Sequence, residues 1–523
     1  MTESSERPTG RKIFSGRILL SDFAVLVYLS ILKLVLHLLT NGNYGYFRDE
    51  LYYIACGEHL DWGYVDQPPL IAFVAKAVRV VLGDSLPALR LLPALAGASL
   101  VFMTGLIVRR LGGSRFSISL ACLAVMIAPV YLIFHTLLTM NAFEPLLWML
   151  CAFIAILILQ GADQRLWLVF GLVAGVGLMN KHSMFFWGSS FLVGLLLTPS
   201  RKLLRSRWPW LGGLVALLIF LPNIIWEYRH DWATLEVLEN ASRNQTLEIS
   251  SLDFIKGQIL LLHPATFPLW VGGLAYYLFS ARGRQFRPLG LTYLALLVVF
   301  IMLKGKVYYL APAYPMLLAS GAVASERLFR RRGGAWLRTS ALLALTVTGI
   351  VTAPLALPVL PVETFISYSD ALGLKGVRTE QNRWGELPQH YADMFGWEEM
   401  TATVAQVYAR LSPEERAKCA IFADNYGEAG AVNFFGPKYG LPKAISGHQN
   451  YYLWGPGSYT GEILITVSSD PQDLEPIFEE IEPAATFTNK YVMPYENNST
   501  IYICRRMKIP LRELWPKIKC YSC

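Results

Sequence analysis

The stretch NYGYFRDELYYIACGEHLDWGYVDQPPL, residues 43–70, follows the first long apolar segment and combines six charged side chains with many aromatic ones. A water-soluble core does not accommodate such a density of carboxylates, because burying an unpaired charge is costly. A loop at a membrane surface does, because aromatic rings favour the interface between lipid headgroups and hydrocarbon. We therefore interpret residues 43–70 as a membrane-surface loop around which the chain is organised. Its charged residues are Arg48, Asp49, Glu50, Glu58, Asp61 and Asp66.

The composition is that of an α-helical membrane protein. Of 523 residues, 54% are hydrophobic and 16% are charged, whereas soluble domains are about 25% charged. Several windows contain about 18 or more nearly continuous apolar residues, the length that crosses a bilayer. In such a protein the net charge of +8 reflects basic loops, so we expect no nucleic-acid partner.

Hydropathy predicts about 11 membrane spans. The segment 68–82 is also apolar, but Lys76 and Arg79 interrupt it, so we predict an interfacial helix there. The pair 166–179 and 184–198 forms either two spans or one re-entrant element. The predicted spans are 18–40, 86–108, 116–134, 142–160, 166–179, 184–198, 209–226, 257–280, 288–303, 308–325 and 336–360.

The basic clusters fall on alternate loops, at residues 1–17, 109–115, 201–207, 282–287 and 327–338. Basic loops are typically cytoplasmic. This orientation predicts a cytoplasmic tail, 1–17, a transmembrane domain, 18–360, and an extracytoplasmic domain, 361–523. The loop 41–86 would face the same side as the last domain, the periplasmic side of an inner (plasma) membrane.

The region 361–523 lacks long apolar runs. Strand-like runs at 419–423, 462–467 and 500–506, with a helix at 428–435, predict a small α/β domain. Cys419 and Cys504 lie in predicted strands and could pair in an oxidising compartment. The Gly-, Pro- and aromatic-rich loop 441–457 is interpreted either as an ordered surface loop or as a lip facing a substrate.

Three lysines, Lys181, Lys304 and Lys306, fall at span ends on the same predicted outer side. Lysines near span ends commonly extend to the interface, which is the simpler interpretation. However, Lys304 and Lys306 flank a glycine and precede Tyr308 and Tyr309. Two ammonium groups at a broken helix end suit a phosphate held at the membrane surface.

These motifs resemble those of a known superfamily. The stretch FRDELYYIACGEHLDWGYVDQPPL resembles the first outside loop of the GT-C polyprenyl-phosphate-sugar transferases, which include protein O-mannosyltransferases and lipid A aminoarabinose transferases. LKGKVYYLAPAYP is similar to the late lysine–tyrosine–proline segment of that superfamily, and NKHS to its lysine-containing turn. The resemblance covers residues 18–330 in order and is strongest with the bacterial branch of the protein-mannosyltransferase type.

The resemblance implies an integral-membrane glycosyltransferase. It would move a sugar from a polyprenyl-phosphate donor to an acceptor hydroxyl, on a glycolipid, a cell-envelope glycan or a protein. One displacement would invert the anomeric configuration. By the same resemblance, Asp49 is the catalytic base, tuned by Glu50 and Arg48. A helix N-cap for residues 50–56 is the structural alternative for Asp49.

The resemblance also implies the remaining site residues. A second acidic residue is expected at the outer end of the fourth span, where Asn141 and Glu144 lie three residues apart on one helix face. The predicted catalytic residues are thus Asp49, Glu50 and Glu144. The predicted substrate-binding residues are Arg48, Tyr52, Asp66, Gln67, Asn141, Lys181, His182, Arg243, Lys304, Lys306, Tyr308 and Tyr309.

The sequence departs from the superfamily pattern at two points. Gln67 stands where the aminoarabinose-type enzymes carry a lysine, so Lys304, Lys306 or Arg243 must supply the missing cation. The metal site of some relatives uses an acidic residue at this turn and a histidine in a later loop. Asp66 is present, but the matching stretch LENASRN, 238–244, has no histidine. We therefore expect no essential cofactor, with a divalent metal ion as the alternative.

Two other classes of protein compete with this interpretation. A transporter or flippase of lipid-linked sugars would place charges near the membrane midplane and show inverted repeats. Here the charges cluster at span ends on one side, and no repeat is found. A membrane-anchored binding protein would need far fewer than about 11 spans. The sequence therefore favours the transferase.

Overall fold

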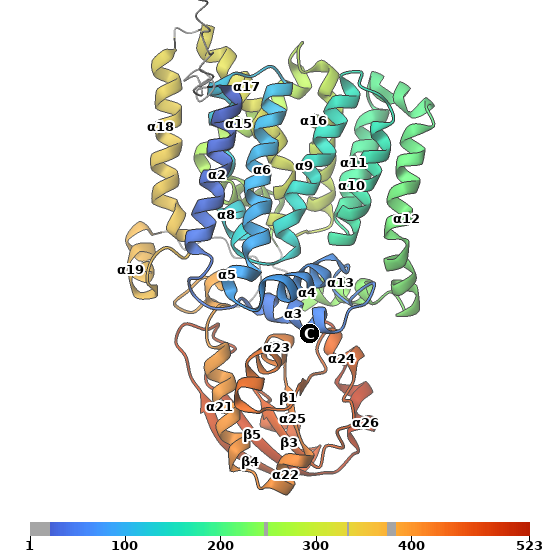
Figure 1. Ribbon diagram of the computed structural model, residues 1–523, viewed down its shortest axis with the longest axis vertical. Helices are drawn as coiled ribbons and strands as arrows, with labels where there is room; N and C mark the ends of the chain where they lie inside the picture. The colour runs from blue at the N-terminus through green and yellow to red at the C-terminus, as the bar shows by residue number, and fades with distance from the viewer. Residues whose placement is uncertain (1–20, 245–248, 332–333, 374–382, 523) are drawn as a thin grey trace, which may run out of the picture.

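A computed structural model of the chain describes residues 21–244, 249–331, 334–373 and 383–522. A bundle of long helices forms one half of the molecule and a small α/β domain forms the other (Figure 1). The predicted basic tail, 1–17, lies outside the described residues. The predicted fold class, a helical membrane protein followed by an α/β domain, is confirmed.

Within the described part of the chain, seven segments are long and apolar enough to cross a membrane, or up to nine if each bent helix pair is one span. The prediction of about 11 spans was therefore too high. The two predicted spans that fail the test are α10 (Leu166–Asn180) and α11 (Met184–Leu196), with 15 and 13 residues. At 1.5 Å per residue they reach only about 20–23 Å, less than the hydrocarbon core of about 30 Å.

The remaining bundle helices follow the predicted order closely. Two of the predicted spans are bent pairs, by 64° between α7 and α8 and by 96° between α14 and α15. The helices are α2 (Asp22–Thr40), α6 (Leu91–Arg110), α7 (Arg115–Ile127), α8 (Pro129–Thr136), α9 (Met140–Leu159), α12 (Trp208–Arg229), α14 (Ser251–Leu261), α15 (Phe267–Phe279), α16 (Arg287–Met302), α17 (Tyr314–Arg331) and α18 (Ala335–Thr352).

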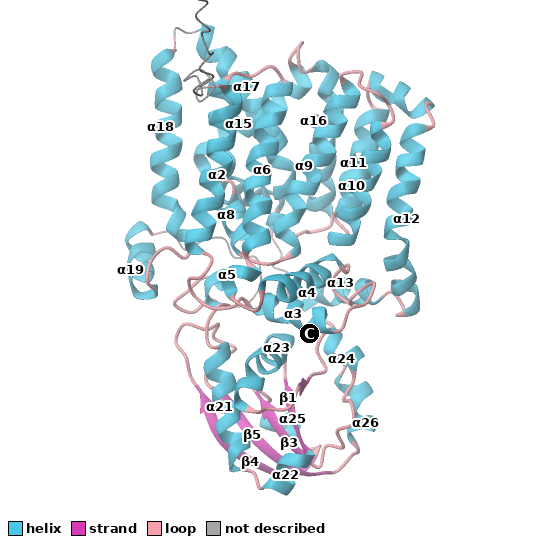
Figure 2. Ribbon diagram, viewed as in Figure 1, coloured by secondary structure: helices cyan, strands magenta, loops and turns pink. Residues whose placement is uncertain are grey.

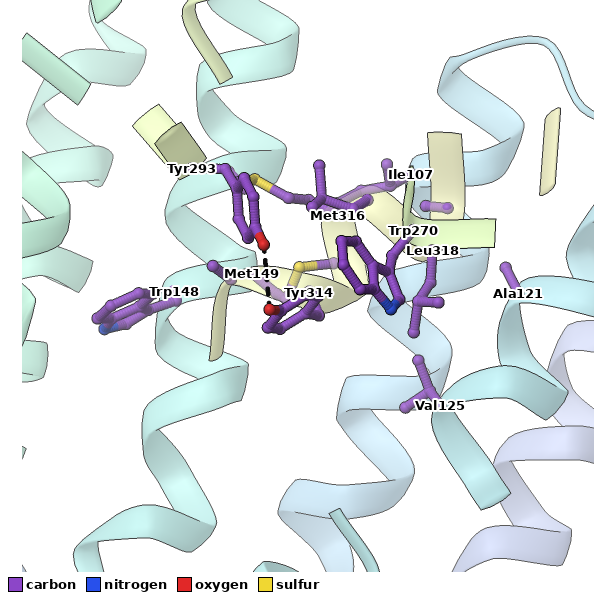
Figure 3. Close-up of a cluster of buried hydrophobic side chains, with 14 of the residues drawn as sticks. Ile107, Ala121, Val125, Trp148, Met149, Trp270, Tyr293, Tyr314, Met316 and Leu318 are labelled. Carbon is purple, nitrogen blue, oxygen red and sulfur yellow. Dashed lines mark hydrogen bonds between the residues drawn. The ribbon is translucent and has the colours of Figure 1, made fainter. Parts of the chain in front are cut away.

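Close packing of apolar side chains fills the centre of the bundle (Figure 3). The Tyr293 hydroxyl donates to the Tyr314 hydroxyl at 3.0 Å, so these buried polar atoms are partnered across α16 and α17. Small residues let other helices approach closely. A Cβ added at Gly171 of α10 would lie 2.0 Å from the carbonyl oxygen of Gly212 on α12, so a larger residue there would push the two helices apart.

A layer of short helices separates the bundle from the α/β domain (Figure 1). It contains α3 (Arg48–Glu58), α4 (Leu70–Leu82), α5 (Leu86–Leu89) and α13 (Ala233–Asn244). The predicted helix at 68–82 is thus present as α4. One side of α4 is buried, while Val80 and Val81 on the other are exposed, as an interfacial helix requires.

The α/β domain contains a five-stranded mixed sheet in the order β2-β1-β3-β5-β4 (Figure 2). The three predicted strands are present as β1 (Cys419–Ala423), β3 (Ile463–Val467) and β5 (Ser499–Met507). Two were missed, because β2 (Ala444–Ile445) is very short and β4 (Phe478–Phe487) is a mostly solvent-facing edge strand without apolar alternation. The helices are α19 (Val362–Leu372), α20 (Gln389–Ala392), α21 (Trp397–Arg410), α22 (Pro413–Lys418), α23 (Tyr426–Phe435), α24 (Asn450–Trp454), α25 (Pro471–Leu474) and α26 (Leu511–Leu514).

The predicted pairing of Cys419 with Cys504 was wrong. Both thiols are free and buried. They lie on β1 and β5, and β3 runs between these strands. Two strand spacings separate the chains by about 9–10 Å, whereas a disulfide needs Cα atoms within about 7 Å.

Helix α23 packs directly on α3 and sets the position of the domain over the loop. A Cβ added at Gly430 would meet the backbone carbon of Leu51 at 3.1 Å, and one at Gly427 would meet Arg48 Cγ at 2.5 Å. The first turn of α23, which begins at Tyr426, therefore lies against the first turn of α3.

Candidate active site

Asp49 lies in the first turn of α3, but it is not the cap of that helix. The N-cap is Phe47, and its backbone N–H donates to the Glu50 carboxylate at 2.9 Å. The alternative interpretation of Asp49 as an N-cap was therefore wrong. Its side chain is 30% exposed and lines two cavities.

The larger of these cavities has a volume of 540 Å³ and lies between the bundle and the α/β domain. We call it the polar cavity. It brings carboxylates and cations together from distant parts of the sequence. The predicted site residues that line it are Arg48, Asp49, Asp66, Lys304, Lys306, Tyr308 and Tyr309.

The smaller cavity, of 210 Å³, meets the polar cavity at Arg48, Asp49 and Tyr308. We call it the apolar cavity, because aliphatic and aromatic side chains of the bundle form much of its wall. Its apolar lining residues from α8 and the following turn are Val130, Ile133, Phe134 and Leu137. Asp49 therefore lies where a polar space and an apolar space join.

A tyrosine from the α/β domain orients the Asp49 carboxylate. The Tyr426 hydroxyl donates to Asp49 Oδ1 at 2.8 Å. The Tyr426 ring is held in turn by Tyr52, with ring centroids 4.7 Å apart, and by His448, at 5.1 Å. The guanidinium of Arg48 lies 4.0 Å from the same carboxylate oxygen. A hydrogen bond and a nearby cation thus fix the direction in which Asp49 presents its charge.

Asp66 is the second carboxylate of the polar cavity. The Tyr52 hydroxyl donates to Asp66 Oδ1 at 3.0 Å, which gives the predicted residue Tyr52 a role in positioning Asp66. Burial, with a smaller contribution from the charge of Asp49, raises the pKa of Asp66 to about 7. Near neutral pH, Asp66 therefore exchanges between its charged and protonated forms.

Glu50 faces away from both cavities, although it is adjacent to Asp49. Its fully buried carboxylate accepts from Arg90 Nε at 3.0 Å and from Arg90 Nη2 at 2.8 Å. It also accepts from the backbone N–H groups of Phe47 and Leu138, both at 2.9 Å. The predicted catalytic role of Glu50 is therefore corrected to a structural one, in which it ties α3 to the bundle.

The surroundings of Asn141 and Glu144, the two residues found at the predicted second acidic position, differ. Asn141 lines the apolar cavity, whereas Glu144 is buried beside it. Lys181 joins the two, donating to Asn141 Oδ1 at 2.7 Å and to Glu144 Oε2 at 3.0 Å, and Ser183 also donates to Glu144. The Lys181 ammonium lies 4.8 Å from the centre of the Tyr309 ring, a cation–π contact. Glu144 thus holds the lysine that supports Tyr309.

Five predicted substrate-binding residues line neither cavity. Tyr52 and Lys181 contact cavity residues, as described above, and the other three lie apart. Gln67 is fully buried, with its amide 3.8 Å from Cys56 Sγ. His182 lies in the turn between α10 and α11, and its Nε2 lies 3.1 Å from Asn223 Oδ1 on α12, which connects this turn to α12. Arg243 is exposed and paired with Glu239 one helical turn earlier. Arg243 therefore does not supply the cation missing at Gln67, and Lys304 and Lys306 remain the candidates.

The α/β domain contributes cavity residues that the sequence did not identify individually. His448 and Gln449 lie in the loop 441–457, so the interpretation of this loop as a substrate-facing lip is the one that the geometry favours. His448 Nδ1 accepts from the Tyr426 backbone N–H at 3.2 Å, which couples the lip to the tyrosine on Asp49. The other lining residues of this wall are Asp424, Asn425, Tyr426, Tyr495 and Ser522.

No group of three His, Cys, Asp or Glu side chains able to hold a metal ion occurs among the described residues. Cys520 forms a disulfide, whereas Cys523 lies outside the described residues. The polar cavity offers carboxylates, lysines and hydroxyl groups.

Comparisons with known proteins find similar sequences over part of the chain. Residues 66–226 match the family described as dolichyl-phosphate-mannose-protein mannosyltransferase. A 234-residue stretch is 28% identical to the lipid A galacturonosyltransferase RgtD of Rhizobium johnstonii. That alignment covers 42% of this chain and 47% of the relative, so the chain spans about half the length of the curated relative that it matches.

Solved structures match over nearly the whole chain. ArnT from Cupriavidus metallidurans bound to undecaprenyl phosphate superposes with a TM-score of 0.60 at 15% identity, covering 94% of this chain and 98% of that one. An Archaeoglobus fulgidus oligosaccharyltransferase superposes with a TM-score of 0.51 at 12% identity, covering 82% and 64%. The chain has the GT-C fold. The family match over residues 66–226 falls on the helices of this fold, from the turn before α4 to α12.

Proposed function

We propose that this protein moves a sugar from a polyprenyl-phosphate donor to an acceptor hydroxyl, with Asp49 as the catalytic base. The observation that carries the proposal is that Asp49, Lys304 and Lys306 line one 540 Å³ cavity. A base for an acceptor and cations for an anionic leaving group are the two requirements of the reaction. The GT-C fold and the matched relatives support the same class of donor.

The proposed reaction is a single displacement. The acceptor oxygen forms a bond to the anomeric carbon, the bond from that carbon to the lipid phosphate breaks, and Asp49 takes the hydroxyl proton. Lys304 and Lys306 stabilise the negative charge that develops on the departing phosphate. Because attack and departure occur on opposite faces of the sugar, the anomeric configuration inverts. Tyr426 keeps the carboxylate aimed at the acceptor.

The two cavities suit an amphipathic substrate. The polar cavity offers ammonium groups and hydroxyls, and the apolar cavity offers aliphatic and aromatic walls formed by Val130, Ile133 and Phe134. The donor would place its sugar and phosphate in the polar cavity and the start of its lipid chain along the apolar cavity. Its anomeric carbon would then lie near Asp49. The acceptor is a hydroxyl of a glycolipid, a cell-envelope glycan or a protein.

An assay with labelled polyprenyl-phosphate sugar tests the proposal. The purified protein, reconstituted in liposomes with envelope glycolipid as acceptor, should release polyprenyl phosphate in step with labelling of the acceptor. Movement of intact sugar-lipid across the bilayer without cleavage would instead establish the flippase. The carboxylates and lysines of the polar cavity lie at the end of the bundle that faces the α/β domain, whereas the substrate site of a transporter is expected near the membrane midplane, which favours the transferase.

The double substitution Lys304→Ala/Lys306→Ala should lower kcat/KM for the donor by about 10–100-fold, because a charged hydrogen bond to phosphate contributes about 1.5–3 kcal/mol. Initial rates at several donor concentrations would measure the effect. Lys256→Ala is the matched control, since Lys256 is exposed and pairs with Asp253 on α14. Unchanged donor kinetics in the double variant would leave interfacial anchoring as the role of these lysines.

We also propose that the active site and the α/β domain face the periplasmic side of the inner membrane. A reporter active only in the cytoplasm should be silent when fused after the last residue of the chain. The same reporter inserted after Arg205, in a basic loop, should be active. A strong signal from the C-terminal fusion would reverse the orientation and place the polar cavity in the cytoplasm.

A further inference from the structure

A third cavity lies at the end of the bundle away from the α/β domain, where α6 and α9 end and α16 begins (Figure 1). Its volume is 900 Å³, within the range of small-molecule binding sites. Six cationic side chains from four separate segments of the chain line it, and we call it the basic cavity. They are Arg110, Lys202, Arg282, Arg284, Arg287 and Arg327.

These six cations are not neutralised by the described part of the protein. No carboxylate lines the basic cavity, and none of the six forms an ion pair with a described residue. Two make other contacts: Arg287 Nε donates to the Leu278 carbonyl at 2.8 Å, and the Arg327 guanidinium lies 5.4 Å from the centre of the Tyr276 ring. Nearby, Arg330 is paired with Glu326. A carboxylate therefore pairs with an arginine at this end of the bundle, but no carboxylate lines the basic cavity.

The general excess of basic residues in cytoplasmic loops explains why such residues occur at this end. It does not explain why six of them converge on a hollow without counter-charges, since like charges held close together repel one another. An anion bound among the six side chains would supply the missing negative charge and reduce this repulsion. Guanidinium groups hold phosphate especially well, because their parallel N–H donors match two of its oxygens.

The floor of the basic cavity distinguishes a lipid from a soluble anion. Aliphatic and aromatic side chains line it beneath the cations, namely Leu111, Ile158, Leu159, Leu203 and Phe286. A fully hydrated ion would leave this apolar surface without a partner. A phospholipid covers both kinds of surface, with its phosphate among the arginines and the beginning of its acyl chains on the floor.

We propose that the basic cavity binds the headgroup of an anionic phospholipid from the leaflet on that side of the membrane. The proposal is independent of the transferase reaction, because the cavity lies at the other end of the bundle from Asp49. The bound lipid would neutralise the arginines and connect the ends of α6, η3 (Arg284–Phe286) and α17. The bundle would thereby gain stability in an anionic membrane.

Native mass spectrometry of the purified full chain with phosphatidylglycerol tests this. In Arg282→Gln/Arg284→Gln, the dissociation constant for the lipid should rise roughly 25-fold, since each interfacial basic residue contributes about fivefold. Both arginines are exposed, so the fold should survive their replacement. Arg205→Gln/Arg207→Gln removes two cations outside the cavity and should bind as wild type does. Lys304→Ala/Lys306→Ala should also bind normally, which separates this cavity from the active site.

Three outcomes would overturn the proposal. The Arg282/Arg284 variant could bind phosphatidylglycerol as tightly as wild type, or the Arg205/Arg207 control could lose as much affinity. Inorganic diphosphate could also bind the cavity as tightly as the lipid, which would assign it to a soluble anion. A lipid-dependent rise in melting temperature that disappears only in the Arg282/Arg284 variant would support the assignment.

Discussion

Asp49→Asn is expected to lower kcat by roughly 10²–10⁴, the usual contribution of a positioned acid or base, while folding and membrane insertion remain normal. The amide keeps the shape of the carboxylate, and its oxygen can still accept the hydrogen bond from Tyr426. It cannot take the acceptor proton. Because Asp49 is not the cap of α3, no loss of helix stability should obscure the kinetic effect. Single-turnover rates with bound donor would measure it.

The matched control is Asp84→Asn. Asp84 follows α4 and its exposed carboxylate pairs with Arg79, outside both active-site cavities, so its rate should remain near that of wild type. A near-normal rate in Asp49→Asn together with a large loss in Glu144→Gln would transfer the role of base to α9. The structure argues against that result, because Glu144 already accepts hydrogen bonds from Lys181 and Ser183.

The membrane part could be predicted because its signals are local. Runs of apolar residues and alternating basic loops identified the helices in order, and the density of carboxylates in residues 43–70 identified the loop that carries Asp49. Lys304 and Lys306 were identified by the glycine and tyrosines beside them. The predicted number of spans was too high because α10 and α11 are apolar but too short to cross a membrane.

The wall formed by the α/β domain could not be predicted in the same way. Tyr426 contacts Asp49 across 377 residues of sequence. Nothing in the segment around Tyr426 indicates a partner in the first loop, because the contact depends on how α23 packs against α3. His448 reaches the cavity through the same packing. Such contacts depend on the tertiary arrangement, which local sequence composition does not reveal.

Glu50 shows why adjacent residues were given a shared role by mistake. Successive residues on an α-helix point about 100° apart, so two adjacent carboxylates can have different surroundings. Asp49 faces the polar cavity, and Glu50 faces Arg90 inside the protein. In the sequence, both are acidic residues within two positions of Arg48. The buried partner, Arg90, lies 40 residues further along the chain.

The second large effect is therefore expected at Glu50, and it concerns stability rather than chemistry. Glu50→Gln should destabilise the protein by about 3–5 kcal/mol, because it leaves the charge of a fully buried arginine without its counter-ion. The amide can accept fewer hydrogen bonds than the carboxylate, which serves Arg90, Phe47 and Leu138 together. Thermal unfolding in detergent, followed by the yield of monodisperse protein, would measure the loss.

Asp49→Asn is the matched control for this prediction, since both substitutions exchange a carboxylate for its amide at neighbouring positions. We expect Asp49→Asn to keep the melting temperature and lose the rate, and Glu50→Gln to lose the melting temperature. Any Glu50→Gln protein that remains folded should keep most of its rate. Wild-type stability with a large loss of rate would instead show that Glu50 acts on the substrate. Glu50 acts through the fold, because its ion pair with Arg90 ties α3 to the bundle, and α3 carries Asp49 at the meeting point of the two cavities.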